Sequence, residues 1–194
     1  MRRTPQAGVP RPLPRVTDPL GDGEIALREF RRDDMPAMIA MLDDEPIVRW
    51  TRVPHPYGER EALDYLARGD AERERGEGIN LGIFDAAGTE LLGSMSVRIA
   101  SWADLRGQLG YLVGAHARGR GVAPRAIRLA SRWGFRKLGL ERIEILVHPE
   151  NEPSQRAAEK AGFKREGVLR SYTRVKAERF DMWSFSALPG ELGD

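Results

Sequence analysis

Apolar residues recur along the chain with two different periods, which predict where strands and helices lie. Residues 25–30 alternate in the manner of a strand, and residues 34–44 carry a helical stripe with an aspartate at its start. Prolines and a glycine over residues 54–58 interrupt this pattern, and a charged helix is expected over residues 59–75. This part of the chain therefore predicts one strand followed by two helices.

From residue 79 onward the period changes to two, which is typical of strands. Strands are expected over residues 79–85, 91–100 and 107–113, a helix over 121–139, a strand over 141–147, a helix over 153–162, and strands near 168–175 and 180–188. This order of elements contains no internal repeat. It predicts an α+β (mixed α/β) fold with a central, mostly antiparallel sheet.

Length and composition fit one domain with a leader. The chain has 194 residues and is 41% hydrophobic and 31% charged, and single cores commonly span about 100–200 residues. Residues 1–23 hold five of the 13 prolines and predict a flexible Pro/Arg-rich leader that buries little. We therefore expect a single domain over residues 24–190.

Several classes of function are disfavoured by composition. The sequence has no cysteine and its three histidines lie far apart, so disulfides and cysteine-ligated metals are excluded and we expect no metal. The net charge of +2 gives little reason to expect a nucleic-acid partner. Neither a membrane span nor a secretory signal is recognisable, which predicts a cytoplasmic protein without a membrane partner.

The segment from Gly110 to Arg128 is the most informative for chemistry. A strand ends at Val113, a turn with two glycines spans residues 118–123, and a helix begins directly after it. Such a turn aims backbone N–H groups and the positive end of a helix at one place, where a phosphate or pyrophosphate can bind. A plain glycine turn beside a solvated arginine face explains this segment equally well, because six arginines and no acidic residue lie between residues 115 and 136.

A second segment, from His148 to Phe163, repeats the arrangement after the next strand. Ser154 lies at the start of the expected helix, where its hydroxyl can cap the helix or point into the open end of the sheet. Two successive strands thus end in helix N-termini at the same edge of the sheet. Open sheets bind ligands at such edges.

Together these two segments resemble the GNAT acetyltransferase superfamily, and in particular its RimJ/RimL-type branch. Its acetyl-CoA motif is matched by Arg118, Gly121 and Ala123, and the branch pattern by Asn151, Ser154, Glu159, Lys160, Gly162 and Phe163. The resemblance covers residues 25–188. It implies a sheet of six to seven strands, splayed between the fourth and fifth strands and flanked by helices.

The resemblance also implies roles for individual residues with acetyl-CoA as co-substrate. The pyrophosphate is expected on the N–H groups of Arg118, Gly119, Arg120, Gly121, Val122 and Ala123. Leu112, Val113 and Asn151 are expected to contact the pantetheine arm, and Arg125 or Arg156 an adenosine phosphate. The N–H of Val113 would polarise the thioester carbonyl, and Ser154 would protonate the departing CoA thiolate.

Two positions depart from the superfamily pattern. Many members carry a glutamate and a tyrosine where this chain has Gln108 and Ala158. At pH 7.4 an α-amine of pKa about 7.8 needs roughly 0.5 kcal/mol to lose its proton, whereas a lysine of pKa about 10.4 needs about 4 kcal/mol. A site without a strand carboxylate therefore favours an α-amine.

Further residues are candidates for the acceptor side. A remote base acting through water is sought among Glu166, Asp181 and His148, and Trp50, Tyr172 and Asp181 are expected to bind the acceptor. Each of these side chains also has a purely structural interpretation, as a packed aromatic or a local cap.

The sequence predicts an N-acetyltransferase that transfers acetyl directly to a primary amine, most simply the α-amine of a protein or peptide. Three alternatives stay open: transfer to a small-molecule amine, acetyl-CoA sensing without turnover, and a nucleic-acid-binding module using Arg128, Arg132 and Arg136. The oligomeric state is also open between a monomer and a homodimer.

Overall fold

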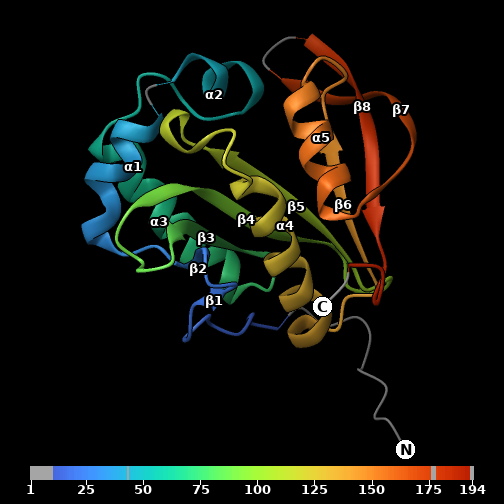
Figure 1. The fold of residues 1–194 in the computed structure, drawn as a ribbon, viewed down its shortest axis with the longest axis horizontal. Helices are drawn as coiled ribbons and strands as arrows, with labels where there is room; N and C mark the ends of the chain where they lie inside the picture. The colour runs from blue at the N-terminus through green and yellow to red at the C-terminus, as the bar shows by residue number, and fades with distance from the viewer. Residues whose placement is uncertain (1–10, 43, 176–177, 193–194) are drawn as a thin grey trace, which may run out of the picture.

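The computed structural model describes residues 11–42, 44–175 and 178–192, which form one eight-stranded sheet with helices on both faces (Figure 1). The strands are β1 (Leu20–Gly21), β2 (Ile25–Glu29), β3 (Gly78–Asp85), β4 (Leu91–Ser101), β5 (Arg106–Val113), β6 (Arg142–Val147), β7 (Lys164–Val175) and β8 (Glu178–Ala187). Their spatial order is β1-β2-β3-β4-β5-β6-β8-β7. Neighbouring strands are antiparallel except β5 and β6, which are parallel. The predicted α+β fold is confirmed.

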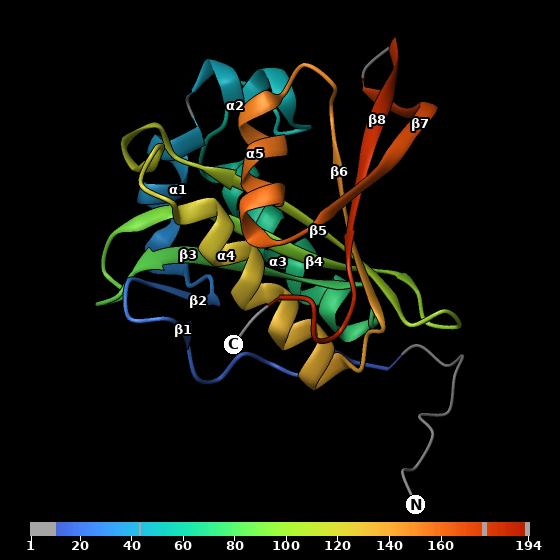
Figure 2. The same cartoon turned by 45° about the vertical axis from the view of Figure 1, so that its right-hand side comes forward.

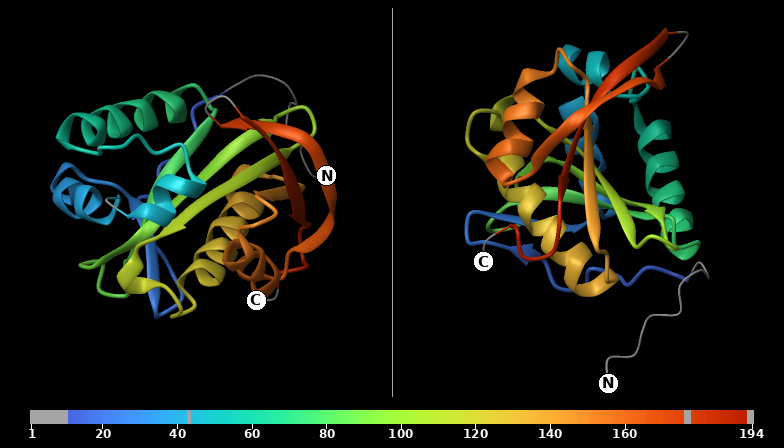
Figure 3. Two further views of the ribbon diagram at one scale, coloured as in Figure 1. Left: turned by 90° about the horizontal axis from the view of Figure 1, so that it is seen from above. Right: turned by 90° about the vertical axis from the view of Figure 1, so that its right-hand side faces the viewer.

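Within the described residues, five α-helices cover the sheet. They are α1 (Met35–Leu42), α2 (Glu45–Trp50), α3 (Glu59–Glu74), α4 (Val122–Trp133) and α5 (Glu152–Ala161), with short turns at Arg32–Asp34, Ala115–Ala117 and Gly134–Leu138. Figure 3 shows α1 and α3 on one face of the sheet and α4 and α5 on the other. In the described part of the chain, none of these helices is long and apolar enough to cross a membrane.

Strand β1 is one more strand than the six to seven expected, and it lies inside the predicted leader. Its two residues pair with Leu27 and Ala26 of β2. Residues 11–23 run beneath the sheet as the dark blue segment of Figure 2. Leu13 is buried, its N–H donates to the carbonyl of Arg73 over 2.9 Å, and Nη1 of Arg73 donates back to the carbonyl of Leu13 over 2.8 Å.

The prediction of a flexible leader is therefore wrong for residues 11–23, and residues 1–10 lie outside the described residues. The physical reason is that Leu13 and Val16, set between prolines, are apolar and join the core. Leu192 also belongs to this core. The packed unit thus extends past both limits of the predicted domain, residues 24–190.

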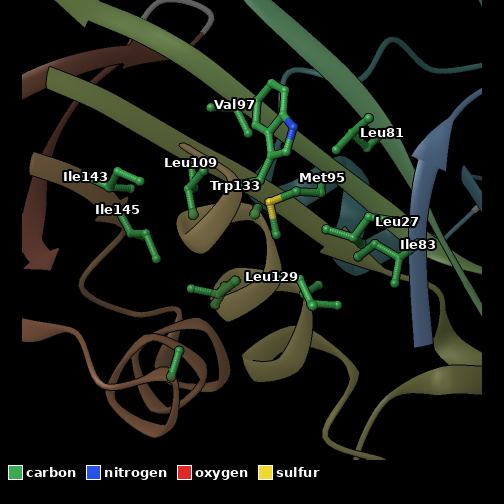
Figure 4. Close-up of a cluster of buried hydrophobic side chains, with 14 of the residues drawn as sticks. Leu27, Leu81, Ile83, Met95, Val97, Leu109, Leu129, Trp133, Ile143 and Ile145 are labelled. Atoms are coloured by element: carbon green, nitrogen blue, oxygen red, sulfur yellow. The ribbon is translucent and has the colours of Figure 1, made fainter. Parts of the chain in front are cut away.

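The face of the sheet beneath α4 and α5 is apolar and holds the main core. Alternate residues of β3, β4, β5 and β6 point into it, and Trp133 and Leu129 of α4 pack against them (Figure 4). Helix α4 presents its apolar stripe inward and its arginines outward, as the helical spacing predicted. The buried positions of α5 are Ala157, Ala158 and Ala161, and such small side chains let a helix lie close to its neighbours.

The opposite face of the sheet is polar near α3. Residues Ser94, Ser96 and Arg98 of β4 point to this face, because they alternate with the buried Met95 and Val97. A smaller apolar cluster seals one end of this face beneath α1 and α2. It consists of Met38, Met41, Leu42, Ile47, Phe84 and Leu91.

A truncation of Leu13 tests whether the leader belongs to the folded unit. The substitution Leu13→Ala removes a side chain that is 2% exposed, and we expect a loss of about 2–5 kcal/mol of unfolding free energy. The matched control Leu188→Ala, at a leucine that is 44% exposed, should change it by less than about 0.5 kcal/mol. Urea denaturation followed by circular dichroism measures both, and equal stabilities of the two variants would contradict the packing of this segment.

Candidate active site

The candidate site lies where β5 and β6 separate. Their ladder runs from Arg106 opposite Arg142 to Leu109 opposite Ile145 and ends there. Beyond that point β5 pairs with β4 alone and β6 with β8 alone. The edges of β5 and β6 that face each other are therefore unpaired, which matches the splay expected between the fourth and fifth predicted strands.

The N–H and C=O groups of β5 point alternately to its two edges, and this alternation decides which of them face the gap. The N–H of Gly114 donates to the carbonyl of Leu92 in β4 over 2.9 Å. Because N–H and C=O groups alternate between the two edges of a strand, those of Leu112 also face β4. The backbone N–H and C=O groups of Tyr111 and Val113 therefore face the gap. This alternation corrects the expectation for Leu112, whose N–H and C=O are directed to β4 and away from the space predicted for pantetheine.

The loop after β5 has the geometry expected of an anion site. Gly119 and Gly121 both have a φ of 76°, which favours glycine, and no described atom lies within 4 Å of the place where a Cβ would stand. Gly121 begins α4 without a side-chain cap from the described residues. The N–H groups of Val122 and Ala123, in the first turn of α4, have no partner within the helix. Both residues line a cleft.

The arginines near this loop are paired with carboxylates from other segments. Arg118 forms an ion pair with Asp44, which precedes α2, and its Nε donates to the carbonyl of Val113 over 3.1 Å. Arg125 contacts Asp22 of the leader at 2.8 Å. The other predicted phosphate contact, Arg156, pairs with a glutamate on its own helix at 3.0 Å. The side chains predicted to meet phosphates thus already have anionic partners in this structure.

Helix α5 begins on the other side of the gap, after β6. Asn151 is its N-cap, and Oδ1 of Asn151 accepts the N–H of Ser154 over 3.2 Å. The interpretation of Ser154 as the cap is therefore wrong, because Asn151 has that role. The hydroxyl of Ser154 instead lies 2.8 Å from Oη of Tyr111, and burial raises the pKa of Tyr111 to about 12.

One cleft connects these groups with the acceptor side. Its volume is about 2010 Å³, compared with about 300–1,000 Å³ for common ligand sites. It is therefore large enough to hold two substrates at once. Predicted residues at its wall include Leu112, Val113, Arg118, Gly119, Gly121, Val122, Ala123, Asn151, Ser154 and Trp50. Arg120 of the predicted loop does not line it, and its side chain is exposed.

Of the three residues predicted to bind the acceptor amine, one lines the cleft. Trp50, at the end of α2, packs against His148 with ring centroids 5.0 Å apart, and His148 packs against Phe180 at the same distance. Tyr172 is 54% exposed and does not line the cleft. Asp181 is also outside it and accepts the N–H of Ser171 over 2.7 Å, which links β7 and β8. The geometry thus separates Tyr172 and Asp181 from Trp50.

The three candidate bases have different environments. Glu166 is exposed and ion-paired with Arg142, whose hydrogen bonds hold the pKa of Glu166 below its usual value and make it a weaker base. His148 lines the cleft, and its Nδ1 accepts the N–H of Glu150 over 3.2 Å. With Asp181 outside the cleft, His148 is the one of these three candidates at its wall.

Sequence analysis missed Tyr111 and Asp44. Tyr111 lies within the strand that the motif identified. Its contact with Ser154 could not be predicted, because it depends on how far apart β5 and α5 lie across the gap. Gln108, which stands where a glutamate is common, lines the cleft, and Ala158 is fully buried. Of the two departures from the superfamily pattern, Gln108 is therefore at the site, whereas Ala158 does not line the cleft.

Comparison with known proteins agrees with this geometry. Residues 24–164 match the family described as Acetyltransferase (GNAT) domain. The uncharacterized N-acetyltransferase p20 of Bacillus licheniformis is 26% identical over 167 residues, which are 86% of this chain and 94% of that protein.

Solved structures show the same fold. Mycobacterium smegmatis RimJ in complex with CoA-disulfide has a TM-score of 0.77 and 24% identity, with 88% of this chain and 84% of that chain covered. The ribosomal-protein-S5-alanine acetyltransferase of Vibrio fischeri has a TM-score of 0.77 and 17% identity, with 91% and 100% covered. The structural neighbours thus include RimJ/RimL-type ribosomal-protein acetyltransferases. With the family match over more than half of its length, the chain belongs to the GNAT N-acetyltransferases.

Proposed function

We propose that this enzyme transfers an acetyl group from acetyl-CoA directly to the α-amine of a protein or peptide N-terminus. The observation that carries the proposal is the gap between β5 and β6, which joins the uncapped start of α4 to the hydroxyl of Ser154. A diphosphate suits the N–H groups at one end, and a linear thioester arm suits the unpaired strand edges between them.

The residues around the gap supply what direct transfer needs. The N–H of Val113 faces the gap and can donate to the thioester oxygen as negative charge develops on it. The amine nitrogen attacks the carbonyl carbon, the C–N bond forms and the C–S bond breaks. Ser154 is placed to give a proton to the leaving sulfur, and the nitrogen releases its surplus proton to water.

Three observations support an α-amine acceptor. The cleft offers glutamine, not a carboxylate, at residue 108, so an amine that is already partly neutral at pH 7.4 is favoured. The cleft is open and wide enough for a polypeptide end. Two structural neighbours are named as ribosomal-protein acetyltransferases that act on protein termini or on an alanine of a ribosomal protein.

A small-molecule amine is the second candidate, because one structural neighbour is a microcin C7 self-immunity acetyltransferase in complex with acetyl-CoA and AMP. The first candidate requires the cleft to admit the end of a polypeptide, whereas the second requires it to admit only a small molecule. Incubation of the enzyme and acetyl-CoA with a mixed library of peptides and small amines, followed by mass spectrometry, identifies the acceptor.

Acetyl-CoA should stabilise the enzyme through the start of α4. At about 100 times its dissociation constant it should add roughly 2.7 kcal/mol to the unfolding free energy. The substitution Ala123→Asp places a carboxylate in the first turn of α4, where it favours the helix but repels a diphosphate. We expect acetyl-CoA affinity to fall at least about tenfold in this variant, measured by thermal shift.

The neutral variant Ala123→Asn is the matched control and should bind nearly as the wild type does. If acetyl-CoA failed to stabilise the wild type, the binding site would be wrongly placed. Stabilisation without CoA release in an amine panel would indicate a sensor, and salt-sensitive binding of nucleic acid alone would indicate the third class of function.

The choice of amine should depend on pH. A peptide with a free α-amine and no lysine should react faster at pH 7.4 than an N-terminally blocked peptide with one lysine. Between pH 7 and pH 9 the neutral fraction of lysine rises about tenfold per unit, while that of the α-amine levels off. The ratio of the α-amine rate to the lysine rate should therefore decrease as pH rises. Equal or faster lysine acetylation at pH 7.4 would overturn the proposed acceptor.

Removal of the Ser154 hydroxyl should affect turnover more than binding. The substitution Ser154→Ala should lower kcat by about 100-fold or more and leave the KM for acetyl-CoA within about twofold. Asn151 still caps α5 in this variant, so the helix should keep its position. Steady-state kinetics measure the effect, and an unchanged kcat would remove Ser154 from the mechanism.

A further inference from the structure

The phenol of Tyr111 has two possible acceptors for one proton, both on Ser154. Oη of Tyr111 lies 2.8 Å from Oγ of Ser154 and 3.0 Å from its backbone carbonyl oxygen. A phenol carries a single proton and donates to one acceptor at a time. The pair therefore has two hydrogen-bonding arrangements with the same positions of the heavy atoms.

This pair lies at the gap. Tyr111 is two residues before Val113 on β5, so their side chains share a face of the sheet. Ser154 belongs to α5, which follows β6. The contact between the hydroxyl groups thus joins the two sides of the separated strands, and both residues line the cleft.

Resting on the function proposed above, we propose that Tyr111 is a positioning residue that supplies Ser154 with a proton during departure of CoA. In the first arrangement the phenol donates to the carbonyl of Ser154, and Oγ–H of Ser154 donates to the phenol oxygen. In the second, the phenol donates to Oγ, which leaves the proton of Ser154 directed to the leaving sulfur.

The step balances as a proton relay. As the C–S bond breaks, sulfur takes the proton of Ser154 and Oγ takes the proton of Tyr111. The tyrosinate then recovers a proton from water along the same path through Ser154. The acceptor nitrogen has released one proton to water, so one proton leaves nitrogen and one reaches sulfur.

The chemistry of a phenol suits this position. Tyr111 is protonated at neutral pH, since the ordinary pKa of a phenol is about 10 and burial raises the pKa of Tyr111 to about 12. A thiol has a pKa of about 8.5, and a phenol lies between a thiol and an aliphatic alcohol in acidity. The proton deficit is therefore more stable on Tyr111 than on Ser154 alone.

A double-mutant cycle tests whether Tyr111 acts through Ser154. Tyr111→Phe keeps the ring and should lower kcat at least about tenfold, with the KM for acetyl-CoA within about twofold. In the Ser154→Ala background, the same substitution should change kcat by less than about twofold, because residues that act as a unit are not additive. An unchanged kcat for Tyr111→Phe, or losses that multiply in the double variant, would overturn the proposal.

Fluorinated tyrosines at residue 111 provide a readout that packing alone does not move. They keep the size of the side chain but make the phenol more acidic. Since the relay requires a protonated phenol, the pH at which kcat falls on the alkaline side should decrease as fluorine is added. These variants also decide the question if Tyr111→Phe fails to fold, and an alkaline limb that does not move would contradict the relay.

A titration of bound CoA separates this proposal from the proposed function. The hydrogen bond that Ser154 donates to the CoA thiolate should be strengthened when Tyr111 in turn donates to Oγ of Ser154. Tyr111→Phe should therefore raise the pKa of the bound thiol, which is followed by thiolate absorbance. No acceptor amine is needed for this measurement. A wild type that acetylates no amine would refute the proposed function, whereas an equal thiol pKa in the wild type and Tyr111→Phe would refute the relay.

Discussion

The separation of β5 from β6 is the constraint on which the site depends. Each strand keeps its outer hydrogen-bonding partner, β4 or β8, while the inner edges lose theirs beyond Leu109 and Ile145. Unpaired backbone groups inside a protein require another partner, either water or a ligand. The fold thus keeps a row of donors and acceptors available between two well-supported strands, and the helices that follow these strands place further N–H groups at the same edge.

The two faces of the sheet have different roles: one supports the separated strands, and the other forms a wall of the cleft. The face beneath α4 and α5 is filled with apolar side chains, including Met95 and Val97 of β4. These side chains pack beneath the two separated strands and support them from one side. Ser94 and Ser96, one residue out of phase with them, give the opposite face a polar floor inside the cleft. A period of two along one strand therefore supplies both the support and the wall of the site.

Much of this arrangement could be predicted from the sequence. The order of the longer elements and the turn after β5 follow from local spacing, because hydrophobic period and glycine conformation are properties of short segments. The packing of Leu13 could not be predicted in the same way, since prolines obscure the periodicity around it. The separation of Tyr172 and Asp181 from the cleft depends on how β7 and β8 pair and bulge, which no local pattern reports.

The contact of Tyr111 with Ser154 is another feature that spacing cannot give. The two residues are 43 positions apart, and their side chains meet across strands that are not paired at that level. Residue 158 of α5, where many family members carry a tyrosine, is an alanine without a hydroxyl. The structure adds that a hydroxyl reaches the neighbourhood of Ser154 from the strand opposite.

The ion pairs of Arg118 with Asp44 and of Arg125 with Asp22 give the arginines of the loop after β5 and of the start of α4 their own counter-ions. An incoming anion has to compete with two tethered carboxylates for these guanidinium groups. Free sulfate or inorganic phosphate brings nothing else to that competition. A ligand whose long tail also occupies the gap between β5 and β6 would make additional contacts, so these ion pairs favour a long anion over a short one of the same charge.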